Sequence, residues 1–61
     1  MTYAVQASNG KFYNGRAGTW EQNLSAKSDA FLYGKEAAER KAAGFNAFSK
    51  LHGFTFTVVE A

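Results

Sequence analysis

The sequence predicts a two-layer α+β fold, in which one helix packs on a small antiparallel sheet in the order strand, strand, short third strand, helix, strand. Three observations support it: alternating stretches near both ends of the chain, an Asn-Gly turn after the first stretch, and an alanine-rich stretch between them. Alternation with a period of two is typical of half-buried strands, and alanine is the strongest helix former. A chain of 61 residues supports one hydrophobic core, so residues 1–61 are expected to form a single domain.

The first two strands are predicted to form a hairpin. Residues 3–7 alternate larger apolar side chains with small or polar ones, and Asn9 and Gly10 follow them. Asn-Gly favours the positive φ angles of a type I′ turn, which places residues 11–14 in the second arm. The stretch after this arm fits neither the helical nor the strand period, and a short third strand is expected over residues 21–25.

The helix is predicted from Lys35 to about Leu51. Five of these positions are alanine, and no proline interrupts them. At 100° per residue, one side of this helix collects Ala38, Ala42, Phe45, Ser49 and His52. Gly53 is expected to end the helix in the left-handed conformation, with the His52 imidazole beside the last carbonyls.

The last strand is predicted over residues 54–59, where aromatic and β-branched residues alternate with threonine. The side chains expected to face the helix are Tyr3, Val5, Phe12, Phe54, Phe56 and Val58, and those expected to face outward are Tyr13, Thr55, Thr57 and Val59. A register slip of one residue would exchange the two faces. No second layer is expected over the outer face, which makes it a candidate contact surface.

The composition argues against catalysis. The chain has no cysteine and one histidine, and its five acidic residues show no paired spacing suited to acid–base chemistry. Structural and catalytic zinc sites need several Cys, His or carboxylate ligands. The expectation is therefore a protein that is not an enzyme and that holds neither a metal nor a cofactor.

The charge is mildly basic, with seven Lys and Arg against five Asp and Glu and a net charge of +2. The basic residues are scattered among acids, which permits a polyanionic partner without requiring one. The first residues have no basic segment followed by an apolar run, and no apolar stretch approaches about 20 residues. These patterns favour a soluble, cytoplasmic protein without a membrane segment.

Aromatic and basic side chains are interleaved in the first third of the chain, a combination found at interface hot spots and at single-strand binding sites. The candidates for contact are Lys11, Tyr13, Arg16 and Trp20, extended by the helix residues Lys35, Glu39 and Arg40. Trp20 also fits the interpretation of a core residue, because tryptophan is highly buried on average.

A pattern over nearly the whole chain resembles small bacteriophage accessory proteins. It consists of Tyr3-x-Val5, the run Asn-Gly-Lys-Phe-Tyr-Asn-Gly over residues 9–15, a tryptophan shortly after, Glu36-Ala37-Ala38 in a helix, and a valine-rich end. Such proteins frequently bind and inhibit a host enzyme or defence complex, with anti-CRISPR proteins as one class. The resemblance implies a phage-encoded inhibitor that binds a host protein or a complex such as CRISPR-Cas in the host cytoplasm.

Two alternatives stay open at this point. The first is a small nucleic-acid-binding protein, with Lys11, Arg16, Lys41 and Lys50 as phosphate contacts. The second is a homodimer, because an exposed edge strand can pair with its twin in a second copy.

Overall fold

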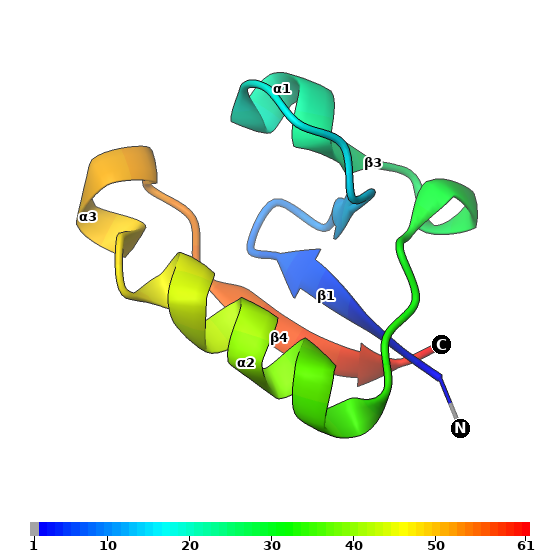
Figure 1. Ribbon diagram of the computed structural model, residues 1–61. Coiled ribbons are helices and arrows are strands. Elements are labelled where there is room, and N and C mark those ends of the chain that lie inside the picture. Colours follow the sequence, from blue (N-terminus) through cyan, green and yellow to red (C-terminus); the bar gives the residue numbers. More distant parts are fainter. Residues whose placement is uncertain (1) are drawn as a thin grey trace.

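The computed structural model describes residues 2–61 and confirms the two-layer α+β fold (Figure 1). Met1, the first residue of the predicted domain, lies outside the described residues. The strands are β1 (Tyr3–Ala7), β2 (Phe12–Tyr13), β3 (Leu24–Ser25) and β4 (Phe56–Glu60). The helical elements are α1 (Trp20–Asn23), the 3₁₀ turn η1 (Lys27–Asp29), α2 (Lys35–Asn46) and α3 (Ser49–His52).

The four strands form one antiparallel sheet in the order β3-β2-β1-β4. Figure 1 shows α2 lying along β1 and β4 on one face of this sheet. Ala38 and Ala42 are buried at the contact, and their small side chains let α2 approach the sheet closely. Val5, in the central strand β1, is fully buried beneath them. These three residues are the middle of the core.

The turn of the first hairpin has three residues, so the predicted type I′ turn is wrong. Ala7 and Lys11 close the loop, since the Ala7 N–H donates to the Lys11 carbonyl at 2.8 Å. Gly10 has a φ of 88°, whereas no described residue other than glycine has a positive φ. The Asn9 side chain accepts a hydrogen bond from the Lys11 N–H at 3.0 Å. This geometry is that of a three-residue loop with a left-handed glycine at its end.

The longer loop exchanges the two faces of β2. A two-residue loop over Asn9-Gly10 would put Phe12 on the helix-facing side, but in the structure Phe12 lies opposite Gln6. Tyr13 therefore faces the helix, with its ring centroid 4.9 Å from that of Phe45. The predicted orientations of both Phe12 and Tyr13 are wrong for this reason. Those of Tyr3, Val5, Phe54, Phe56 and Val58 are confirmed.

The predicted third strand over residues 21–25 is in large part a helical turn. Thr19 precedes α1, and its N–H donates to the side-chain oxygen of Gln22 at 3.1 Å. This contact is half of a capping box, and the Thr-x-x-Gln spacing is its sequence signature. Only Leu24 and Ser25 pair with β2, and Leu24 is buried in the core.

The segment after η1 lies beside the first hairpin and extends the sheet locally. Tyr33 pairs with Tyr3 through two backbone hydrogen bonds of 2.8 Å, and the Phe31 N–H donates to the Tyr13 carbonyl at 2.9 Å. The Phe31 ring packs against Tyr33, with centroids 4.8 Å apart, and it also lies over Gly15. Burial, and secondarily the neighbouring Tyr13, raise the pKa of Tyr33 above its ordinary value.

The single helix predicted to reach Leu51 is divided into α2 and α3, with Ala47 and Phe48 between them. The reason is a pair of side-chain contacts to the following strand. The side chain of Asn46, the last residue of α2, binds the backbone of Phe56, and the His52 ring turns inward to bind the Phe45 carbonyl. The expected end of the helical region is confirmed, because Gly53 has a φ of 78° and its N–H donates to the Ser49 carbonyl at 2.7 Å.

The Asn46 side chain holds the start of β4 in the way a neighbouring strand would. Its Oδ1 accepts from the Phe56 N–H at 2.7 Å, and its Nδ2 donates to the Phe56 carbonyl at 3.0 Å. Both bonds are partly buried. Asn46 thus satisfies two backbone groups that the sheet itself leaves unpaired.

Replacing Asn46 with alanine is expected to lower the free energy of unfolding by about 1–3 kcal/mol, because the two Phe56 groups lose their partners. The matched control is Asn9→Ala, which removes one exposed hydrogen bond and is expected to cost less than about 1 kcal/mol. Urea denaturation of both variants measures the difference. Equal losses of stability would show that the Asn46 contacts contribute nothing beyond an ordinary surface bond.

Candidate functional site

Five rings from four parts of the chain meet at the end of the molecule that carries α1 and α3. They belong to Trp20, Phe45, His52, Phe54 and Phe56, and we call them the aromatic cluster. The Trp20 ring lies in the middle, with centroid distances of 4.7 Å to His52, 5.0 Å to Phe45, 5.2 Å to Phe56 and 6.1 Å to Phe54. Tilted and edge-to-face pairs at such distances are favourable. The cluster therefore ties both short helices to the sheet.

His52 makes two hydrogen bonds through its ring. Nε2 lies 2.8 Å from the Phe45 carbonyl, near the end of α2, and Nδ1 accepts from the Phe54 N–H at 3.1 Å. A carbonyl can only accept, so Nε2 carries the proton and Nδ1 is bare, as in a neutral imidazole. The sequence predicts the His52 imidazole beside the last carbonyls of a helix that ends near Leu51, but the carbonyl that its ring contacts is that of Phe45, near the end of α2. The His52 ring joins the end of α2 to the turn that leads into β4.

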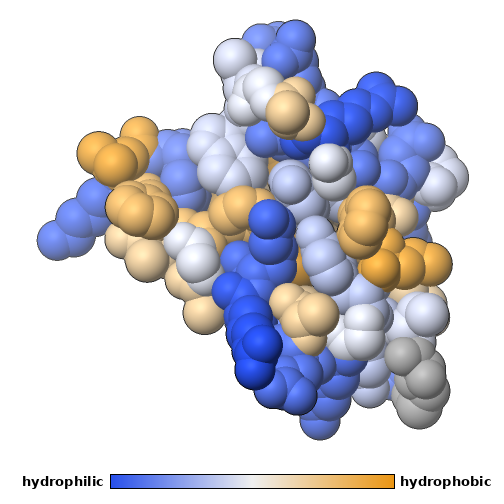
Figure 2. Space-filling model, in the orientation of Figure 1, coloured by the Kyte–Doolittle hydropathy of each residue, from blue (hydrophilic) through white to orange (hydrophobic). Residues whose placement is uncertain are grey.

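α3 and the residue just before it present two large apolar side chains to solvent. Phe48 is 60% exposed and Leu51 is 83% exposed. They are three residues apart around one helical turn, a spacing that brings side chains to the same side. We call Phe48, Lys50 and Leu51 the α3 ridge. Figure 2 shows the apolar surface that gathers over α3 at the left edge of the molecule.

A second apolar area lies over the segment after η1, at the right of Figure 2. It contains Phe31, which is 48% exposed, and Leu32, which is 51% exposed. Phe31 packs against Tyr33 and is joined to Tyr13 through its backbone. This area is therefore more strongly tied into the fold than the tip of the α3 ridge.

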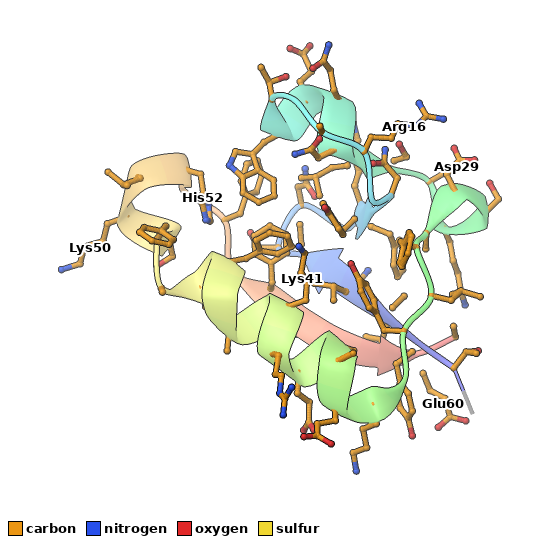
Figure 3. All side chains as sticks on the ribbon, in the orientation of Figure 1. Arg16, Asp29, Lys41, Lys50, His52 and Glu60 are labelled. Atoms are coloured by element: carbon orange, nitrogen blue, oxygen red, sulfur yellow. The ribbon has the colours of Figure 1, made fainter. Side chains whose placement is uncertain are left out.

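Two lysines differ in how they relate to the rings. The Lys41 ammonium lies 5.3 Å from the Tyr13 ring centroid and 5.2 Å from that of Phe45, within the range of cation–π attraction. Lys50 belongs to α3, and in Figure 3 its side chain points away from the aromatic cluster. The two lysines place positive charge near the aromatic cluster and the α3 ridge, and Glu21 on α1 adds one negative charge.

The structure joins only part of the predicted contact set. Tyr13 and Trp20 are both half-buried and meet through Phe45, at centroid distances of 4.9 Å and 5.0 Å. Trp20 packs on the core, as its interpretation as a core residue predicts. The other candidates are exposed and belong to the hairpin, the following loop and α2: Lys11, Arg16, Lys35, Glu39 and Arg40.

Among the exposed candidates, Arg40 has a partner within its own helix. Its Nη2 lies 2.7 Å from the Glu36 Oε1, and both side chains are 79% exposed. An exposed pair of this kind contributes only a few tenths of a kcal/mol. Arg16 lies on the loop near the top of Figure 3, far from Lys50 on α3. The predicted phosphate contacts Arg16 and Lys50 thus lie on different parts of the molecule.

Phe48 and Leu51 were missed as contact residues, although the sequence holds a signal for one of them. On a continuous helix at 100° per residue, Leu51 lies about 140° from Ala38, on the polar side. A large apolar residue there has no core to enter. The division between α2 and α3 then turns Phe48 outward as well, and that division depends on contacts with residues 54–56.

Residues 2–61 show neither a metal-binding group of side chains, nor a pocket, nor a helix suited to a membrane. No three His, Cys, Asp or Glu side chains gather as metal ligands, and no pocket is found. None of the helices in this part of the chain has the length and apolar character needed to cross a bilayer.

Comparison of the chain with protein-family models, with curated proteins and with solved structures finds no match.

Proposed function

We propose that this chain is a non-catalytic protein-binding module that inserts the α3 ridge into an apolar hollow on its partner. The observation that carries the proposal is that Phe48 and Leu51 are both exposed on one turn. The ring of His52 holds this turn in place through its hydrogen bond to the Phe45 carbonyl. Burying a leucine or phenylalanine side chain contributes about 1.5–3 kcal/mol. Two such residues side by side can therefore anchor an interface.

The α3 ridge is held in place before it meets a partner. The His52 ring binds the backbone on both sides of α3, and Gly53 closes its last turn. Trp20 packs on the His52 ring at a centroid distance of 4.7 Å. A surface that is already ordered loses little conformational entropy on binding, so more of the apolar burial appears as affinity.

The charges around the ridge suggest the chemistry of the partner. Lys50 lies within the ridge and Lys41 lies over the neighbouring rings, and the net charge of the chain is +2. A hollow with an acidic rim would complement them and speed the encounter. Following the resemblance described above, we propose a cytoplasmic host protein or defence complex as the partner and inhibition of it as the outcome.

Leu51→Ser is expected to lower the retention of the partner at least tenfold, because it removes the most exposed anchor. The matched control is Leu32→Ser, the same change at a half-exposed leucine outside the ridge. Wild type and both variants are used as tagged baits in nuclease-treated bacterial lysate, and retained proteins are quantified by mass spectrometry. Both variants are expected to keep the wild-type circular dichroism spectrum.

Two outcomes would overturn the proposal. One is equal retention by the wild type and Leu51→Ser, and the other is a loss that follows Leu32→Ser alone. The nucleic-acid alternative gives a third pattern, in which nuclease removes every retained protein and binding falls steeply with salt.

A further inference from the structure

The outer edge of β4 is the exposed edge of the sheet next to the main helix. β4 pairs with β1 on one side only, in a register that sets Val59 opposite Ala4 and Val58 opposite Val5. The Ala61 N–H donates to the Thr2 carbonyl at 2.9 Å. Because antiparallel partners alternate, the backbone groups of 57, 59 and 61 point toward β1, and those of 56, 58 and 60 point away from it.

Asn46 occupies one of these three outward positions. Its side chain takes both backbone groups of Phe56, at 2.7 Å and 3.0 Å. Val58 and Glu60 have no such partner among residues 2–61. The free edge is therefore two outward residues long. Its strand, Phe-Thr-Val-Val-Glu, contains neither the lysine nor the proline that commonly prevents edge pairing.

We propose that this edge pairs in antiparallel fashion with the same edge of a second copy, with Val59 opposite Val59 of the second copy. Hydrogen-bonded pairs can form only between outward residues. With Val59 on the two-fold axis, Val58 pairs with Glu60 of the second copy and Glu60 with Val58, which makes four backbone hydrogen bonds. With Val58 on the axis, Glu60 would meet Phe56, whose groups Asn46 already holds. Asn46 thus selects the register.

The helix above the edge is compatible with this arrangement. α2 lies over β1 and β4 on one face of the sheet, so a two-fold axis through Val59 would place the two copies of α2 on the same face of the joined sheet. Lys35 and Glu39 share a stripe of α2 with Asn46, at spacings of four and seven residues. The stripe carries one charge of each sign, so the two copies do not repel each other.

The size of the contact sets the expected strength. Four hydrogen bonds and one helix stripe form an interface at the low end of the size range, below about 1,200 Å². The dimer is therefore expected to be weak and to depend on protein concentration. It leaves the α3 ridge free, so it is independent of the proposed protein-binding function.

Cysteine cross-linking tests the register directly, because the chain contains no cysteine of its own. In Val59→Cys, the Cα atoms of residue 59 in the two copies would lie about 4.5 Å apart, within the range of a disulfide. In the control Thr57→Cys, each cysteine would be four residues from its twin, about 13 Å away. Both side chains are on the outer face of β4. Under a glutathione redox buffer, we expect at least ten times more disulfide dimer from Val59→Cys.

Sedimentation equilibrium up to about 1 mM protein is the second measurement. Glu60→Pro removes an outward N–H and is expected to weaken the dimer at least tenfold, whereas Glu60→Gln keeps this N–H and should behave as the wild type. A wild-type protein that stays monomeric at 1 mM, or equal cross-linking of both cysteine variants, would overturn the proposal. So would a dimer that Leu51→Ser abolishes, because that result would place the contact at the α3 ridge.

Discussion

Replacing Phe56 with alanine is expected to lower the free energy of unfolding by about 3–5 kcal/mol. Phe56 is 3% exposed, and its ring lies 4.9 Å from Phe45 and 5.2 Å from Trp20 between centroids. The substitution removes the apolar area of the ring and leaves a cavity beneath α2. Because Phe56 also begins β4, the surrounding backbone has little freedom to collapse into this cavity.

The size of this loss matters because the chain is short. At about 0.05–0.15 kcal/mol per residue, a domain of this length has only about 3–9 kcal/mol of stability. Phe56→Ala is therefore expected to be largely unfolded at 37 °C. The measurement is urea denaturation followed by the fluorescence of Trp20, the only tryptophan, and by circular dichroism.

Phe48→Ala is the matched control for Phe56→Ala. It makes the same chemical change at a residue that is 60% exposed, and the expected change in stability is within about 0.5 kcal/mol. Similar urea midpoints for the two variants would contradict the assignment of Phe56 to the core and of Phe48 to the exposed ridge.

Gly15→Ala is expected to be the next most damaging change, lowering the free energy of unfolding by about 2–4 kcal/mol. Gly15 has a φ of 80°, a conformation that costs an L-residue roughly 1–2 kcal/mol. In addition, a Cβ at this position would collide with the Phe31 ring. The ring would have to leave Tyr33, against which it packs.

Two comparisons separate these causes. Gly10 has a φ of 88° but open space around a Cβ, so Gly10→Ala measures the backbone cost without a collision. Phe31→Ala combined with Gly15→Ala removes the collision and is expected to recover part of the loss, which a double-mutant cycle by urea denaturation measures. If Gly15→Ala and Gly10→Ala cost the same, the contact between Gly15 and Phe31 has no influence on stability.

The parts of the fold that follow from short-range patterns could be predicted. The alternation of residues 3–7 and the β-branched residues before Glu60 identify the two long strands, and Gly53 ends the helical region as expected. The face of α2 that carries Ala38 and Ala42 follows from the helical period. In each case the local preference and the tertiary structure agree.

The errors in the predicted strand faces and helix length come from loop lengths and side-chain contacts, which the spacing of apolar residues does not reveal. One extra residue in the first loop moves Phe12 and Tyr13 to opposite faces from those predicted, because the side-chain period of a strand is two. The propensity of the alanine-rich stretch extends the predicted helix through Ala47 and Phe48. It cannot include the hydrogen bonds of Asn46 and His52, which depend on where β4 begins.

The candidate site was predictable only in part, because it also depends on contacts between residues that are distant in the sequence. The interpretation of Trp20 as a core residue follows from residue type, and the structure places its ring among four others. The α3 ridge depends on a change of helix direction that propensity does not indicate. The length of the free edge of β4 depends on one side chain, that of Asn46, which binds the backbone of Phe56 ten residues later in the chain.

The central place of β1 in the sheet has a consequence for the order in which the molecule can form. The ribosome makes β4, which pairs with β1 along five positions, about 50 residues after β1. Until β4 emerges, α2 has only half of its supporting surface, and the aromatic cluster lacks Phe54 and Phe56. The growing chain thus carries its apolar residues uncovered, and cooperative folding has to wait for long-range pairing, which is slower than local contacts.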